Sequence, residues 1–204
     1  MKNFKKIAAL AVVCAMSVAA LAACGSSSSS AEKTEATEAV VTEAAEAEGE
    51  DLGFTEVEIF SGVEQEFLNL NAVYFQPVDM TGGYKAEDYD CHLELDVSAL
   101  DNGFGYGTGD WVPYLTVEYE VSQDGWDGES GTFMPMAASD GPHYGANIKL
   151  NGDGVYTVKF TVKFPDSSTY LIHTDETGPE EHEFPDAIEY EYDSWEFVDG
   201  AWAE

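Results

Sequence analysis

Apolar and polar residues alternate with a period of two over much of the chain. The alternation is clearest in five segments: 54–60, 91–97, 114–121, 155–164 and 188–198. These segments are rich in Val, Tyr, Phe, Trp and Thr, the residue types that suit half-buried β-strands. Clusters of Gly, Asp, Asn and Ser separate them, as is typical of turns. The pattern predicts an all-β domain of seven to nine short strands, arranged as an antiparallel β-sandwich.

The segment 131–164 contains the strongest local turn signals. Asn151-Gly152-Asp153-Gly154 separates two apolar runs, and turns of this composition commonly join the strands of a hairpin. We therefore expect residues 144–150 and 155–164 to pair as a hairpin. The preceding residues are expected to form a strand and a tight corner at Asp140-Gly141-Pro142, followed by a strand that turns back.

The N-terminal residues have a different character. An apolar run from Ile7 to Ala20 follows three lysines, is too short for a permanent membrane span, and fits a secretory signal. It ends in Leu21-Ala22-Ala23-Cys24-Gly25, which resembles the lipobox of bacterial lipoproteins. The resemblance implies cleavage before Cys24, a lipid on its thiol, and an extracytoplasmic protein anchored to the cell membrane. An ordinary secretory signal with an incidental cysteine is the alternative.

Residues 24–51 are rich in Ser, Glu, Ala and Thr and contain no aromatic residue. Such a segment buries too little apolar surface to offset chain entropy, so we expect a disordered acidic tether. The expected organisation is a lipoprotein signal peptide at 1–23, the lipidated tether at 24–51, and one β-sandwich domain at 52–204. The length of this last part allows a hydrophobic core.

Charge excludes one class of partner. The chain has 40 acidic residues, 8 lysines and no arginine, and its formal net charge is −32 at pH 7. A surface of this sign repels nucleic acid and concentrates cations near it. We therefore expect no nucleic-acid partner, and we interpret most of the carboxylates as a solvated surface.

The chain contains four histidines: His92, His143, His173 and His182. His92 and Glu94 project from one face of the predicted strand 91–97, whereas Cys91 projects from the apolar face. An imidazole and a carboxylate about 7 Å apart along a strand either bind one metal ion or are simply solvated. A blue-copper centre needs a thiolate beside two histidines. Because Cys91 points away from His92, we expect a buried structural cysteine instead.

Two methionines precede the corner at 140–142. Thioether sulfur suits copper(I) and imidazole suits copper, iron or zinc, so Met136 and His143 form a candidate pair of ligands. Methionine as an adaptable core residue is the alternative, and we assign Met134 to the core. The polar and acidic neighbours of the other two histidines, His173 and His182, indicate exposed loop positions.

Four segments together resemble the bacterial periplasmic iron-transport accessory proteins. The segments are 72–80, 92–121, 131–150 and 173–178. Members of that family are copper-binding, immunoglobulin-like sandwich dimers that work beside a high-affinity iron permease. The resemblance extends over about residues 55–198, and long segments match in order, which makes it more specific than a single motif.

The resemblance implies a set of metal ligands. His92 and Glu94 match the histidine and glutamate of the family's H-x-E strand, and Met136 and His143 match its methionine and histidine seven residues apart. His173 matches the histidine that opens a family loop. These five residues are expected to bind copper.

A second site follows from the same resemblance. The family has a carboxylate group linked to iron or manganese, which points here to Asp140 with Glu94. The chain departs from the family at "GPEEHEF" (178–184), where a Trp-Phe segment is usual. The loop shape and the role of His182 therefore stay open.

The implied function is that of an accessory protein for high-affinity iron uptake rather than an enzyme. Copper would be held in a His/Met site and iron handed to a membrane permease, with manganese or zinc as substitute metals and a homodimer as the assembly. Two alternatives of other classes stay open. Trp111 and Trp126 suit a glycan- or protein-recognition module, and a copper-dependent redox reaction on iron would define a metal-dependent oxidoreductase.

Overall fold

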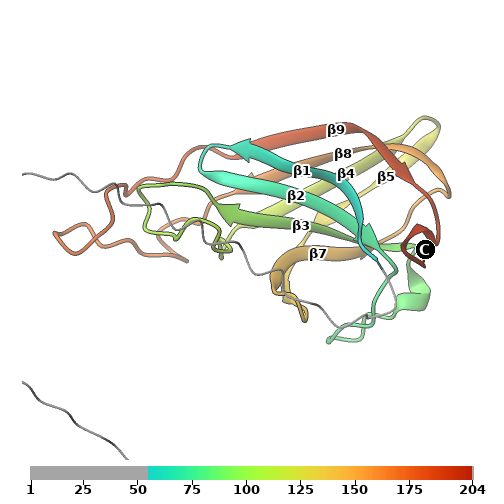
Figure 1. Cartoon of the computed structure of the whole chain (residues 1–204), viewed down its shortest axis with the longest axis horizontal. Coiled ribbons are helices and arrows are strands. Elements are labelled where there is room, and N and C mark those ends of the chain that lie inside the picture. Colours follow the sequence, from blue (N-terminus) through green and yellow to red (C-terminus); the bar gives the residue numbers. More distant parts are fainter. Residues whose placement is uncertain (1–54, 204) are drawn as a thin grey trace, which may run out of the picture. The chain divides into compact units, whose positions relative to one another are not determined.

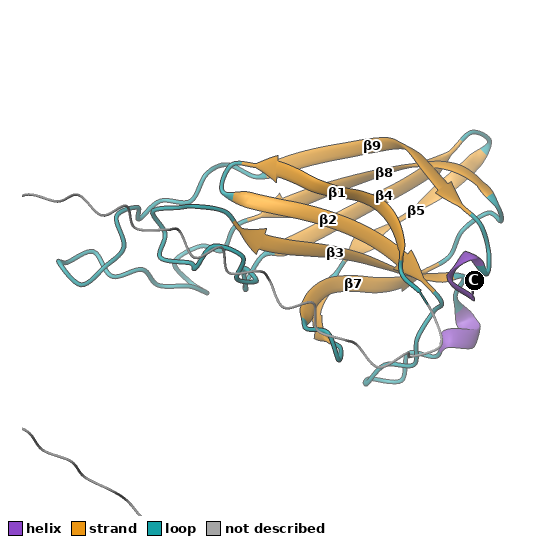
Figure 2. Cartoon of the chain, in the orientation of Figure 1, coloured by secondary structure: helices purple, strands orange, loops and turns teal. Residues whose placement is uncertain are grey.

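The structure is a computed structural model that describes residues 55–203. The signal peptide, the lipidation site Cys24 and the tether at 24–51 lie outside these residues. The described part consists almost entirely of β-strands and loops (Figure 2). None of its helices is long and apolar enough to span a membrane.

Nine strands and two short 3-10 helices make up the described residues. The strands are β1 (Val57–Gln65), β2 (Leu68–Phe75), β3 (Cys91–Ala99), β4 (Thr116–Gln123), β5 (Trp126–Thr132), β6 (Met134–Ala137), β7 (Pro142–Ile148), β8 (Gly154–Lys163) and β9 (Ile188–Phe197). The 3-10 helices are η1 (Ala86–Asp88) and η2 (Ala201–Ala203).

The strands form two antiparallel sheets that face each other (Figure 1). The five-stranded sheet has the order β1-β2-β3-β7-β6, and the four-stranded sheet has the order β5-β4-β8-β9. This arrangement confirms the predicted all-β, immunoglobulin-like antiparallel sandwich.

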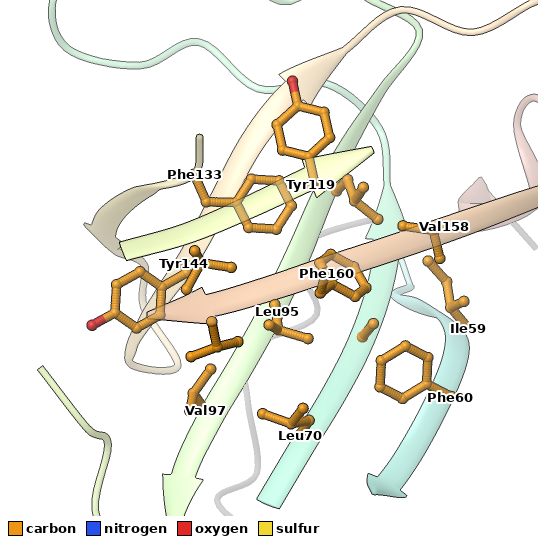
Figure 3. Close-up of a cluster of buried hydrophobic side chains, with 14 of the residues drawn as sticks. Ile59, Phe60, Leu70, Leu95, Val97, Tyr119, Phe133, Tyr144, Val158 and Phe160 are labelled. Atoms are coloured by element: carbon orange, nitrogen blue, oxygen red, sulfur yellow. The ribbon is translucent and has the colours of Figure 1, made fainter. Parts of the chain in front are cut away.

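Alternating side chains fill the space between the sheets. Leu95 and Val97 of β3 lie in this core with Val158 and Phe160 of β8 (Figure 3), and all four are at most 1% exposed. Full burial of a side chain of this size stabilises the fold by about 1.5–3 kcal/mol. Cys91 lies in the same layer with no exposed surface, and burial raises the pKa of its thiol. This confirms the interpretation of Cys91 as a buried cysteine that faces the apolar side.

One buried tyrosine fastens a long connection to the core. The hydroxyl of Tyr144 on β7 donates to the carbonyl of Val112 at 2.8 Å and accepts from the backbone N–H of Leu115 at 3.1 Å. Both backbone groups belong to the segment that leads from β3 to β4. The inward face of β7 therefore fastens the connection between the two sheets. The side chains on its outward face take no part in this contact.

The hairpin expected between residues 144–150 and 155–164 is wrong. β7 pairs with β3 and β6, whereas β8 pairs with β4 and β9, so the turn at 151–154 carries the chain from one sheet to the other. The hydroxyl of Tyr156 on β8 fixes this turn, since it accepts from the N–H of Asn151 at 2.8 Å and donates to the carbonyl of Gly152 at 2.7 Å. The composition predicted a turn correctly, but it did not specify which strands pair.

The other turn clusters include one that is mostly strand. Residues 122–131 form one of the Gly-, Asp- and Ser-rich clusters that predicted turns between the strands. Only Asp124 and Gly125, however, lie between the paired residues Gln123 and Trp126. Gly125 has φ 81°, as a two-residue hairpin turn requires. Residues 122 and 123 end β4, and residues 126–131 belong to β5, an edge strand that buries little surface and so lacks an apolar alternation.

Candidate metal centre

The candidate ligands gather on the outward face of the five-stranded sheet. Directly opposed residues of antiparallel strands project to the same side. Glu94 of β3 lies opposite Gly145 of β7, and His143 of β7 lies opposite Met136 of β6. His92, two residues before Glu94, shares that face. The corner at 140–142 therefore brings Met136 and His143 together, as the sequence predicted.

Three of these side chains form a tight, buried group. Ligand atoms of His92, Glu94 and His143 all lie within 4.8 Å of one another. The three residues are only 1%, 3% and 5% exposed. Two imidazoles and a carboxylate are costly to bury unless they are hydrogen-bonded or bind a metal ion.

The amide of Asn147 determines which nitrogen of His92 carries the proton. Asn147 Nδ2 donates to the carbonyl of Val78 at 2.7 Å, and its Oδ1 accepts from the backbone N–H of Val78 at 3.2 Å. The same Oδ1 lies 2.8 Å from His92 Nδ1, which must therefore be the donor. Burial lowers the pKa of His92, although the bond to Asn147 acts in the opposite direction. Neutral His92 thus keeps a free lone pair on Nε2.

His143 is oriented in the same way by a carboxylate. Its Nδ1 donates to Glu94 Oε1 at 2.8 Å. Burial by itself lowers the pKa of His143, but the bond to Glu94 and the nearby carboxylates of Asp96 and Asp140 outweigh it, and the pKa is raised. Its Nε2 is buried and has no hydrogen-bond partner among the described residues. The two rings are 5.9 Å apart between centroids, at 76°.

Gly145 leaves space beside these rings. A Cβ atom at this position would lie 2.8 Å from His92 Nε2 and 3.1 Å from the carbonyl oxygen of Leu93. Both distances are shorter than ordinary van der Waals contacts. Glycine therefore keeps His92 Nε2 accessible from the side of β6.

A cleft of about 1690 Å³ opens over this group. Met136 and Asp140 line it, as does Met134. Met134 is 60% exposed, so its assignment to the core was wrong. The reason is the period of two: Met134 and Met136 share the outward face, whereas Phe133 directly before them is buried.

Carboxylates surround the buried group. Burial, with the charges of Glu94, Asp140 and Asp96, raises the pKa of Glu56 to about 7. Burial, with Glu94 and Asp140, raises the pKa of Asp96 to about 6. Glu94 and Asp140 thus lie in one acidic group with two further acids.

Sequence reasoning missed Glu56 and Asn147. Asn147 follows His143 and Gly145 on the same face of β7, so strand spacing could have indicated it. Glu56 carries no comparable signal: it belongs to the alternating segment 54–60, and nothing in the sequence indicates that this residue, which precedes β1 in the structure, lies near His143.

The described chain does not bring His173 to this group. His173 is exposed on the long loop between β8 and β9, and its Nδ1 lies 3.1 Å from Thr177 Oγ1. His182, on the same loop, is also exposed, as its surroundings predicted.

The two tryptophans considered for recognition are packed against other rings. Trp111 lies 5.3 Å from Tyr144 between ring centroids, and its Nε1 is buried. Trp126 meets Tyr156 edge-on at 5.8 Å. Neither forms an exposed platform of the kind that a glycan-binding surface uses.

The fold and this group of side chains define a β-sandwich protein with a candidate metal centre on one sheet face. The family described as Fe2+ transport protein matches residues 53–199. The chain belongs to this family, which confirms the resemblance found in the sequence. The family is defined by transport rather than by a catalysed reaction, in agreement with the expectation that the protein is not an enzyme.

Solved structures of similar proteins share the fold. FetP of uropathogenic E. coli strain F11 is 41% identical, with a TM-score of 0.66 over 72% of this chain and 99% of FetP. The copper-reconstituted P19 protein of Campylobacter jejuni is 35% identical, with a TM-score of 0.63 over 68% of this chain and 94% of P19. A 34 kDa membrane antigen of Treponema pallidum is 39% identical over 168 residues, which span 78% of this chain and 82% of the antigen.

Proposed function

We propose that the protein is an extracytoplasmic metal-binding accessory protein for high-affinity iron uptake. It holds copper through His92, His143 and Met136, with Glu94 beside them, and hands iron to a membrane permease. The observation that carries this proposal is the buried pair of imidazoles whose Nδ1 atoms are both hydrogen-bonded and whose Nε2 atoms are both free. Copper-bound structures of FetP and P19, which share the fold, support the choice of metal.

The chain's own residues suit such an ion. Asn147 and Glu94 hold the Nδ1 protons, so that the Nε2 lone pairs are directed away from the strands. Partners of this kind orient metal-binding histidines and raise their basicity. Bound copper would supply a soft, redox-active ion, for which imidazole and thioether are suitable donors.

Iron would be the cargo and would bind to the harder ligands. Glu56, Glu94, Asp96 and Asp140 form one acidic group at the cleft. Carboxylate oxygens suit hard cations, so this group supports a second site in which Asp140 and Glu94 take part. Manganese or zinc would bind to these sites as a substitute when it competes with iron or copper.

A homodimer would account for His173. Within one chain this exposed residue does not join His92 and His143, so a second copy would have to bring it to the copper site. In the N-terminal part, a signal peptide at 1–23 would direct export, and a lipid on Cys24 with a tether at 24–51 would keep the domain at 52–204 at the membrane beside its permease.

Copper titration tests the proposal. The wild-type chain should bind about one copper ion, and removal of a ligand or its support commonly costs about 10–100-fold in affinity. We expect at least this loss in His143→Ala and in Met136→Ala, measured by competition with a chelator. His182→Ala is the matched control, because it removes an exposed histidine outside the cleft. Unchanged affinity and stoichiometry in both ligand variants would contradict the site.

A further inference from the structure

The methionines of the described residues are gathered in one place. Met80, Met134 and Met136 all line the cleft above the buried histidines. Methionine usually fills gaps in hydrophobic cores, yet none of these three is buried. Only Met136 was expected as a ligand, so the positions of the other two need a separate explanation.

Met134 lies beside an open path to His92. It is opposite Gly145 on β7, and Gly145 is in turn opposite Glu94 on β3. Because Gly145 has no side chain, nothing from β7 stands between the Met134 side chain and the space around His92 Nε2. A Cβ at Gly145 would come within 2.8 Å of that nitrogen and would close the path.

Met80 approaches from another wall of the same cleft. Its N–H donates to the carbonyl of Tyr84 at 3.1 Å, which closes a small turn in the loop between β2 and β3. Two residues earlier, both backbone groups of Val78 are bonded to Asn147, whose Oδ1 also holds His92. The turn that carries Met80 is therefore fastened to the partner of a proposed ligand.

We propose that Met134 and Met80 form a thioether entry site for monovalent copper at the mouth of the cleft. The ion passes from their sulfur atoms to Met136, His92 and His143 by exchange of ligands. Copper stays in the +1 state. The thioethers and neutral His92 carry no proton on their donor atoms, whereas His143, whose pKa is raised, gives its Nε2 proton to the solvent whenever it is in the imidazolium form. This inference rests on the proposed function, since it requires that the buried histidines bind copper.

The chemistry of the cleft suits such a transfer. Thioethers are soft, uncharged donors that select copper(I), and two of them bind more weakly than a site that also contains imidazoles. The histidines themselves are at most 5% exposed, so an ion cannot reach them without passing the cleft. The acidic group around the cleft raises the local concentration of cations.

Loading kinetics test the entry site. The wild-type chain and the double variant Met80→Leu/Met134→Leu receive copper(I) from its bicinchoninate complex, whose colour disappears on transfer. Leucine conserves volume, so the fold should be little affected. We expect loading in the double variant to be slower by about tenfold, within the range by which single interfaces alter association rates. The final stoichiometry and affinity should be unchanged.

Two contrary results are distinguishable. Equal loading rates in the wild type and the double variant, with copper bound at the histidines, would overturn the entry site and leave the proposed function standing. Failure of the wild type itself to bind copper would overturn both. A matched control, Leu171→Ala, changes an exposed apolar side chain outside the cleft and should load at the wild-type rate.

A binding measurement provides a second readout. Silver(I) is a diamagnetic ion with the ligand preference of copper(I), and it shifts the NMR signals of methionine methyl groups that bind it. In His92→Gln/His143→Gln, which lacks the buried donors, we expect silver(I) to shift the signals of Met134 and Met80. Unshifted signals for both residues would overturn the entry site.

Discussion

The Glu56 carboxyl lies near other carboxylates, and this makes the stability of the protein depend on pH. Its pKa rises from an ordinary value of 4.5 to about 7 on folding. Between these values the folded chain binds more protons than the unfolded chain does, so stability falls as the pH rises through this window. Above about pH 7 the folded chain carries the full repulsion between Glu56 and the neighbouring carboxylates.

The variant Glu56→Gln should remove this repulsion in the metal-free protein. At about pH 8 we expect its Tm to exceed that of the wild type by about 1–4 °C, a shift that corresponds to about 1 kcal/mol or less for a domain of this size. At about pH 4.5 the two proteins should melt together, because the wild-type carboxyl is then protonated in the folded state. The measurement is calorimetry in the presence of a chelator.

Glu191→Gln is the matched control, since Glu191 is exposed on β9, in the other sheet, and does not line the cleft. A lower Tm for Glu56→Gln at pH 8 would contradict the account of this residue. With iron bound, Glu56→Gln should have a lower Tm than the wild type at about pH 8, because the cation stabilises the ionised carboxylate of Glu56.

At the scale of elements, β7 and the loop before β3 are joined by Asn147. The variant Asn147→Ala removes the acceptor of His92 Nδ1 and both bonds to Val78. We expect copper affinity to fall by about 10–100-fold, as for other partners of metal-binding histidines. Hydrogen exchange at the Val78 amide should become faster, because its acceptor is lost. Competition titration and exchange mass spectrometry measure the two effects.

Asn71→Ala provides the matched comparison. Asn71 Oδ1 accepts from the backbone N–H of Gly62 at 2.7 Å, a similar bond elsewhere on the same sheet. This variant should exchange faster at Gly62 and keep its copper affinity. Equal losses of copper affinity in the two variants would indicate a general effect on the sheet, and the specific role of Asn147 would be wrong.

The sequence predicted the strands better than it predicted their partners. Alternation revealed β3, β4, β8 and β9, because apolar side chains on one face of each strand alternate with polar ones on the other. β5 was taken for a turn, since an edge strand with two glycines buries too little to alternate. The turn at 151–154 was recognised, yet its strands belong to different sheets, because pairing is decided by long-range packing rather than by local composition.

The candidate site was also predicted only in part, because local spacing is visible in the sequence whereas long-range packing is not. Period-two spacing placed His92 and Glu94 on one face, and the corner placed Met136 near His143. The same spacing put Met134 on that face, but its apolar side chain led us to assign it to the core. Glu56 could not be found, because only the folded sandwich brings the residues before β1 to the cleft.

At the scale of the whole molecule, charge opposes folding. The chain carries 40 acidic residues against 8 basic ones, and such an excess destabilises a compact state through self-repulsion. Raising the ionic strength shortens the screening length from about 30 Å at 0.01 M to about 8 Å at 0.15 M. We therefore expect the Tm of the metal-free protein to rise by several degrees over this range, as followed by circular dichroism.

Sodium chloride and potassium chloride at equal ionic strength should have equal effects, because screening does not depend on the identity of the cation. A Tm that stays constant or falls with added salt would show that the ion pairs, such as Lys159–Glu189, outweigh the general repulsion.

The two faces of β7 also limit how this protein can evolve. Residues 143, 145 and 147 face the cleft, whereas Tyr144 and Ile148 face the core, and the Tyr144 hydroxyl fastens the connection between the sheets. An insertion or deletion of one residue would exchange the two sets. Lineages can therefore alter β7 by substitution but not by a change of length. Descendants that retain the core would inherit the spacing between His143 and Asn147 with it.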